Sequence, residues 1–277
     1  MFKVEFIEAS NLVGKERAVG VLRSPASQIA LASYRQNVWR HTALMGLPGY
    51  VSLVAHNWAT ANYAAQIELK ITAPTAEHAV RADQLMNGLM QGGNEEKQRL
   101  LIEHTKNCER FMERTTGAYK DILETVLKTV IILAWGSFET LVEDLHSGVL
   151  AESPALFAHT AGKKFRFRTR EAFQGTYSNS FQNDAVIDGL LKNQALDALA
   201  LIRHLLVHKS GVVDVMYQRD SAGVPLLAEF ASVKIGEPIR ISGKSVLNMV
   251  NPALDIGYSL IEAVDAWVAQ RQKSGAA

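Results

Sequence analysis

Apolar side chains recur at helical spacing through the middle of this 277-residue chain, and this pattern constrains the fold class. Residues 94–150 are periodic throughout, and a helix of that length must bury its apolar stripe against other elements. Similar patterns over 24–46, 51–71 and 74–91 predict three further helices. The stripe of the long segment consists of Tyr119, Ile122, Leu123, Val126, Val130, Leu133 and Leu141. The sequence therefore predicts a mainly α protein.

Glycine and proline interrupt the helical pattern and suggest how the chain is divided. The breaks are Leu47-Pro48-Gly49, Gly92-Gly93 and Thr115-Thr116-Gly117. The last break is the predicted domain boundary. Residues 1–115 then form a helical N-terminal region of unknown role, residues 116–272 form a second domain, and the tail 273–277 is expected to be disordered.

The second domain is predicted to contain more than helices. One helix is expected over 184–209, with Gly211 well placed to end it, and a last helix runs from a cap at Ser245 or Asn251 to about residue 270. The segments between them are short, apolar and bounded by glycine and proline, which is typical of strands. The predicted strands cover 212–217, 226–233 and 238–241. We therefore expect a helical bundle with a small β-hairpin insertion.

Composition excludes several classes of protein. The single cysteine, Cys108, rules out an intramolecular disulfide and a cysteine zinc site. The longest apolar run, 130–135, is far shorter than the ~20 residues that span a bilayer, and the charged start does not resemble a signal peptide. These features predict a cytoplasmic protein without membrane contact. Because the net charge is only +1, any contact with nucleic acid must come from a local basic patch.

The most informative motif lies in the apolar helix that ends near Gly211. Arg203 is the only charged residue between Asp197 and His208, in a run that is otherwise apolar except for His204. Burying an unpaired guanidinium costs several kcal/mol in effective terms, so Arg203 is expected to face a cleft, a partner or a subunit interface. An internal salt bridge, for example to Glu139, is the structural alternative.

The spacing Arg-x4-His is weak on its own, because Arg99 and His104 repeat it and Arg35 and His41 are only one residue further apart. Arg99 and His104 lie in a highly charged stretch, which is typical of a solvated helix face.

On a helix, Arg203 and His208 are ~140° apart, whereas His204 and His208 are ~40° apart. Three arrangements remain open. The arginine bends round, His208 swings outward at the last turn, or a second subunit supplies the missing group.

These residue types suit RNA cleavage without a metal. A histidine titrates near neutral pH and can move a proton to or from the 2′-hydroxyl or the leaving oxygen. An arginine holds a phosphate through two parallel hydrogen bonds and stabilises its extra negative charge. The last turn of a helix favours a protonated imidazole, which suits His208 as the acid.

The segment Arg203-His-Leu-Leu-Val-His208, followed by Lys-Ser-Gly-Val-Val-Asp, resembles the Arg-x4–6-His motif of HEPN-superfamily proteins. The segment 134–144, Ala-Trp-Gly-Ser-Phe-Glu-Thr-Leu-Val-Glu-Asp, is similar to the first long helix of such domains. The segment 236–242, Gly-Glu-Pro-Ile-Arg-Ile-Ser, with the final helix is similar in layout to bacterial members. The resemblance covers about residues 117–270.

This resemblance implies an all-α bundle that forms a homodimer, with the two motif helices facing each other across a cleft. In many members it also implies a metal-independent endoribonuclease that leaves a 2′,3′-cyclic phosphate, in a toxin–antitoxin or phage-defence context with an antitoxin or defence partner. Arg203 and His208 match the catalytic pair. His204 fills the polar position after the arginine, where asparagine or aspartate is common, and Glu139 matches an acidic residue with an orienting role.

Other charged residues are candidate RNA contacts. Arg166, Arg168 and Arg170 alternate with Phe165 and Phe167, a pattern that suits phosphate and base contacts, although a plain basic surface strand has the same pattern. Lys209, next to the motif, is a further candidate.

The i, i+4 spacing of His204 and His208 suits a metal, but no acidic residue lies between them and no third ligand follows, so neither a metal nor a cofactor is predicted. The alternative function is a non-catalytic HEPN-like dimer that binds RNA, a nucleotide or a partner protein.

Overall fold

The structure is a computed structural model that describes residues 4–6, 9, 17–69, 75–89, 99–100, 102–104, 106–107, 117–160, 165–167 and 169–275. Its elements are α2 (Pro25–Leu69), α3 (Ala76–Leu89), α5 (Gly117–Glu152), η1 (Pro154–Thr160), α6 (Arg170–Ser180), α7 (Ala185–Leu191), α8 (Gln194–Lys209), α9 (Val215–Ser221), η2 (Pro225–Phe230) and α10 (Gly243–Lys273). The expectation of a mainly α protein is confirmed.

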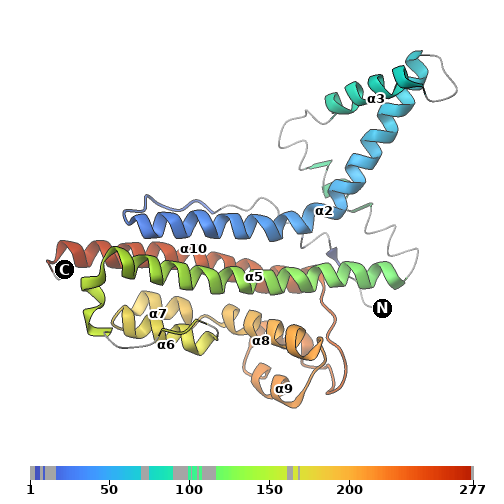
Figure 1. Cartoon of the computed structure of the whole chain (residues 1–277). Coiled ribbons are helices and arrows are strands. Elements are labelled where there is room, and N and C mark those ends of the chain that lie inside the picture. The colour runs from blue at the N-terminus through green and yellow to red at the C-terminus, as the bar shows by residue number, and fades with distance from the viewer. Residues whose placement is uncertain are drawn as a thin grey trace.

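Two long helices, α5 and α10, lie side by side in the middle of the bundle (Figure 1). The first half of α2 packs on one side of this pair, and the shorter helices α6 to α9 pack on the other. The end of α2 and α3 project away from the bundle (Figure 1). The apolar stripe predicted for the central helix is buried only in part: α5 contacts α2, α8 and α10, and Leu123, Val130 and Leu141 are buried, whereas Ile122 and Leu133 are exposed.

In the described part of the chain, α5 is the only helix long and apolar enough by composition to cross a membrane, and half of the apolar window is buried inside the bundle. Its central position accounts for that composition.

The predicted domain boundary near residue 115 does not coincide with a break in the core. Val4, Phe6 and Val38 belong to the same buried cluster as the side chains of α5, α8 and α10. Tyr34 explains the close approach of α2 to α10: its hydroxyl donates to the Leu254 carbonyl, 3.2 Å away. Residues from the N-terminal region therefore complete the bundle.

Proline does not divide α2, contrary to the expected break at Leu47-Pro48-Gly49. The helix continues through Pro48 to Leu69, and its second half takes a different direction from the first (Figure 1). A proline inside a helix removes one backbone hydrogen bond and clashes with the preceding turn, which bends a helix without ending it.

The helix expected over 184–209 is two helices, because Asn193 starts a new one. Its side chain accepts a hydrogen bond from the Ala195 amide at 2.9 Å, which caps α8. The predicted end of α8 is confirmed, since Ser210 is left-handed and Gly211 has φ +78°. Helix α10 begins at Gly243, after a cap at Ser242, and continues to Lys273, so it includes the first residue of the predicted disordered tail. Of that tail, 276–277 lie outside the described residues.

The three predicted strands and the β-hairpin insertion are wrong. Residues 212–241 hold α9 and η2, and the described chain there contains a single isolated bridge, between Val212 and Pro238. The physical reason is capping: the Asp214 carboxylate accepts from the Tyr217 amide at 2.8 Å and starts α9, and Pro225 at the first position starts η2.

Candidate functional site

Helix α8 presents its apolar face to the core and its polar side chains to the surface. The buried residues include Leu199, Ile202 and Leu205, at helical spacing. Arg203 is half-buried between them, whereas His204 and His208 are exposed. The helix therefore anchors the motif in the bundle and leaves its charged and titratable groups accessible.

Arg203 forms no ion pair or hydrogen bond with any residue that the structure describes. Its guanidinium lies close enough to Glu139 to influence the pKa of that carboxyl, but not close enough to form a salt bridge. The structural alternative of an internal Arg203–Glu139 salt bridge is therefore absent from this arrangement. Three neighbouring hollows of the surface have Arg203 in common.

The three hollows differ in the elements that line them. The α2 hollow, about 400 Å³, lies between Asn37, Arg40 and His41 of α2, the α5 residues from Ile132 to Thr140, and Arg203. The histidine hollow, about 590 Å³, contains Arg203, His204 and His208 with residues of α6 and α9. The loop hollow, about 900 Å³, is lined by Glu139, Glu143, Phe165, Arg166, Phe167 and Arg203, among others. Arg203 lines all three hollows.

The two histidines of the motif lie together at the C-terminal end of α8. Their ring centroids are 4.7 Å apart, which the ~40° separation on one helix face allows. Both rings line the histidine hollow together with Arg203. A single chain thus brings the arginine and both histidines to one hollow, although they do not share one helix face.

Glu139 lines both the α2 hollow and the loop hollow. Burial raises the pKa of its carboxyl, while the Trp135 indole and the Arg203 charge lower it less strongly. The carboxyl therefore takes up a proton more readily than an exposed glutamate does.

Some of the residues predicted to contact RNA are already paired with carboxylates, and others are not. Arg170 forms an ion pair with Asp197, which joins the starts of α6 and α8. Lys209 pairs with Asp214 at 3.3 Å. Arg166 is exposed on the loop hollow, and its backbone is held by the Thr176 hydroxyl. Arg168 lies outside the described residues.

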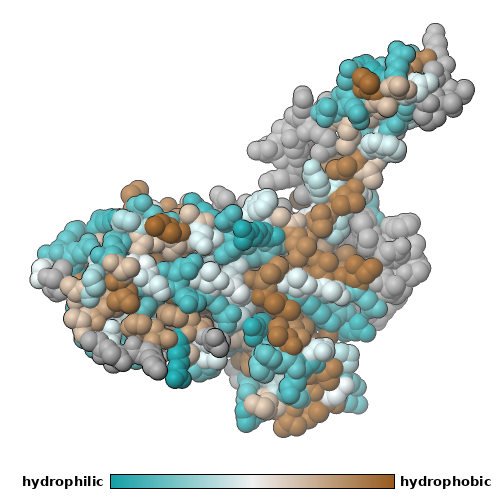
Figure 2. All heavy atoms as spheres, viewed as in Figure 1, coloured by the Kyte–Doolittle hydropathy of each residue, from teal (hydrophilic) through white to brown (hydrophobic). Residues whose placement is uncertain are grey.

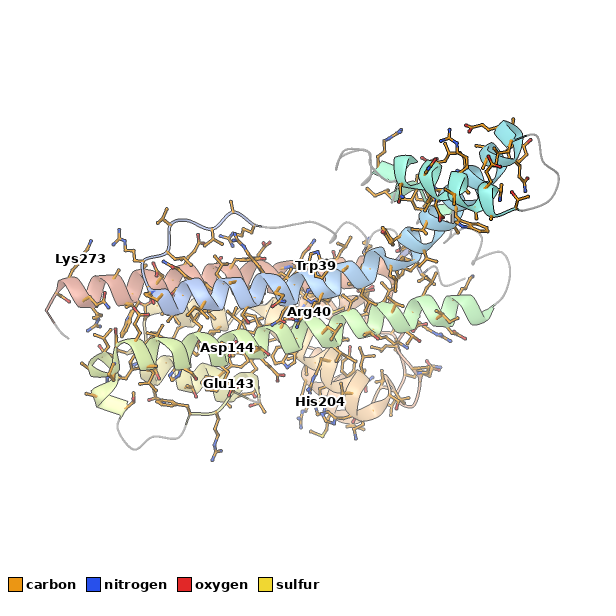
Figure 3. The ribbon with its side chains drawn as sticks, turned by 45° about the horizontal axis from the view of Figure 1, so that its top comes forward. Trp39, Arg40, Glu143, Asp144, His204 and Lys273 are labelled. Atoms are coloured by element: carbon orange, nitrogen blue, oxygen red, sulfur yellow. The ribbon has the colours of Figure 1, made fainter. Side chains whose placement is uncertain are left out.

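Sequence reasoning missed the contribution of α2. Asn37, Arg40 and His41 face Arg203 across the α2 hollow, about 160 residues away in sequence. Figure 3 shows Arg40 where α2 lies beside α5, and His204 on α8 across α5 from it. The one signal was the Arg35–His41 spacing, but only His41 of that pair lines the hollow.

His41 is 1% exposed, and neither of its ring nitrogens has a hydrogen-bond partner. Burial lowers the pKa of His41 to about 4, so the ring is neutral at pH 7 and offers one donor and one acceptor.

No group of three or more His, Cys, Asp or Glu side chains suited to a metal ion occurs among the residues described here. The comparisons with family models, with curated proteins and with solved structures found no match for this chain.

Proposed function

We propose that this chain is a metal-independent endoribonuclease of the HEPN type. The observation that supports this most directly is the unpaired, half-buried guanidinium of Arg203 in one hollow with His204 and His208. A guanidinium without a carboxylate partner is suited to bind a phosphate, and a neighbouring imidazole is suited to move a proton at neutral pH.

The reaction needs only these groups and the RNA. One histidine removes the proton from the 2′-hydroxyl, and the 2′-oxygen attacks the adjacent phosphorus. The P–O5′ bond breaks, and the departing 5′-oxygen takes a proton from a second imidazole. Arg203 stabilises the negative charge that builds up on the phosphoryl oxygens. The products are a 2′,3′-cyclic phosphate and a 5′-hydroxyl. His208, in the last turn of α8, is the proposed acid.

We further propose that the protein acts as a homodimer. Exposed apolar side chains flank the histidines: Val207 is 44% exposed, Val215 67% and Met216 60%. Figure 2 shows hydrophobic atoms gathered over the part of the surface formed by α8 and α9. Exposed apolar surface of this kind is typical of a protein interface. A second copy seated there would bring two motif helices together across a two-fold axis.

The RNA-binding surface in this proposal extends from Arg203 into the loop hollow, where Arg166 is exposed. The net charge of +1 makes this local arrangement, rather than the whole-molecule field, responsible for RNA binding. We place such a nuclease in the cytoplasm, in a toxin–antitoxin or phage-defence setting with an antitoxin or defence partner.

The test is an RNA-cleavage assay of the purified chain with and without EDTA. Cleavage that persists in EDTA and disappears in Arg203→Ala and His208→Ala supports the proposal. Arg99→Ala and His104→Ala have the same residue types and spacing outside the site, so they are the matched controls and keep full activity. Equal activity in all four variants contradicts the proposal. RNA retained by the wild type without product favours the non-catalytic RNA-binding dimer.

A further inference from the structure

The α2 hollow is the part of the site to which the N-terminal region contributes residues, and its size is that of a ligand-binding pocket. Its volume of about 400 Å³ falls in the range of ligand pockets, roughly 300–1,000 Å³. Three helices form it, and Gly136 of α5 leaves it open: an added Cβ there would meet no atom within 4 Å.

Two guanidinium groups border this hollow, and neither is neutralised by a carboxylate. Arg40 is exposed, and its described contact is a hydrogen bond to the Asn37 side-chain oxygen at 3.3 Å. Arg203 forms no ion pair within the described chain. Glu139, whose carboxylate lines the same hollow, forms no ion pair with either of them in the described part of the chain. Two arginines on one concave surface favour an anion with several oxygens, such as a phosphate.

The remaining polar groups favour a ligand that also has neutral donors and acceptors. His41 lines the hollow with both ring nitrogens unpaired, although 99% of the residue is removed from solvent. Buried polar groups are almost always hydrogen-bonded, so an unpaired neutral imidazole is unusual. Asn37 and Thr140 add amide and hydroxyl groups. A base or ribose offers matching donors and acceptors.

We propose that the α2 hollow is a nucleotide subsite, in which α2 holds the nucleotide next to the scissile phosphate of a bound RNA. This inference rests on the proposed function, because Arg203 is the group shared by the hollow and the cleavage site. Arg40 and Arg203 bind successive phosphates, and Asn37, His41 and Thr140 face the sugar and base between them. The N-terminal region is thereby a part of the substrate site.

The test measures binding of a short fluorescein-labelled 2′-O-methyl RNA to the full-length protein by fluorescence anisotropy. This probe lacks the attacking hydroxyl, so it reports binding without cleavage. Arg40→Ala removes one phosphate contact, and Gly136→Leu fills the hollow with a strong helix former and leaves every charge in place. Arg23→Ala is the matched control, since Arg23 precedes Pro25 at the start of α2, and Pro25 lies ~22 Å from Arg40 along the helix axis.

We expect Kd to rise roughly tenfold in Arg40→Ala and Gly136→Leu and to stay within about twofold of wild type in Arg23→Ala. The slope of log Kd against log salt concentration decreases by ~1 in Arg40→Ala and is unchanged in Gly136→Leu. Melting temperatures close to wild type verify that both variants are folded.

Wild-type affinity in both variants, together with lost binding in Arg203→Ala, overturns the subsite and leaves the proposed nuclease intact. A wild-type protein that binds no RNA contradicts both. Loss of binding in Arg23→Ala equal to that in Arg40→Ala also overturns the subsite, because the effect is then one of total charge.

Discussion

Glu139 and Arg203 line the same two hollows of the surface and form no ion pair with each other. Because the carboxylate does not neutralise the guanidinium, Arg203 remains free to bind an anion. Burial raises the pKa of the Glu139 carboxyl, while the Trp135 indole and the Arg203 charge lower it less strongly.

If the proposed function holds, we expect the substitution Glu139→Gln to tighten RNA binding. It removes a negative charge beside the proposed phosphate site, and an effect of about twofold to fivefold is expected for charges that are partly screened by water. The measurement is the Kd of a non-cleavable RNA at low and high salt, and the gain disappears at high salt. Weaker binding in this variant would instead assign to Glu139 the orienting role implied by the HEPN resemblance.

The substitution Arg203→Lys keeps the positive charge and removes the planar, two-pronged donor. We expect RNA cleavage to slow by at least about tenfold, while RNA affinity changes little. Initial cleavage rates and anisotropy on the same preparation separate the two effects. Arg219→Lys, at an exposed position paired with Asp220, is the control. A rate equal to wild type in Arg203→Lys speaks against phosphate binding through two parallel hydrogen bonds.

The proposed homodimer depends on the apolar rim beside the histidines. Met216→Glu places a charge on this rim and is expected to convert the dimer into a monomer. Ile29→Glu, at a similarly exposed apolar position on α2, is the control and leaves the dimer intact. Size-exclusion chromatography with light scattering gives the mass of each variant. A monomeric wild type at micromolar concentration rules out the dimer.

Stability is expected to fall in mild acid because His146 is buried. Burial lowers its pKa to about 4, and five aromatic rings and the Ser180 hydroxyl surround it. The unfolded histidine takes up a proton near pH 6.5, so between pH 6.5 and 4 the unfolded state binds more protons and stability decreases as the pH falls.

From this shift, His146 alone accounts for a loss on the order of 2–3 kcal/mol by pH 4. Urea unfolding at pH 7 and pH 4.5 measures it. His146→Phe is expected to be less stable at pH 7, since Ser180 loses its partner, but to lose less stability between the two pH values. An unchanged pH dependence in this variant refutes the assignment to His146.

The contact between α2 and α10 depends on a glycine. A Cβ at Gly257 would collide with the hydroxyl and ring of Tyr34, so Gly257→Ala forces the helices apart. We expect a loss of about 1–3 kcal/mol in unfolding free energy, typical of overpacking. Gly189→Ala, at an exposed helical position with open space around it, is stabilising by about 0.5–1 kcal/mol. Equal effects at both positions contradict the packing.

Local signals in the sequence predicted the parts of the site that lie on α8. The single charge in an apolar run identified Arg203 as unusual, and the four-residue spacing placed His204 and His208 on one face. Whether Arg203 meets a carboxylate depends on where α5 puts Glu139, which no local pattern specifies. The strand prediction failed for a related reason, because apolar segments of only about four to eight residues suit a short helix as well as a strand.

The sequence by itself determined the helical character of the chain, the start of α5 at Gly117 and the end of α8 before Gly211, since periodicity, capping and backbone propensity act over a few residues. Only the tertiary structure decided that α2 belongs to the bundle and to the site. Its start is held by Asp265 of α10 and Glu152 of α5, whose carboxylates accept from the Ser24 and Ala26 amides. Contacts between residues more than 120 positions apart leave no periodic trace, because packing, not spacing, brings them together.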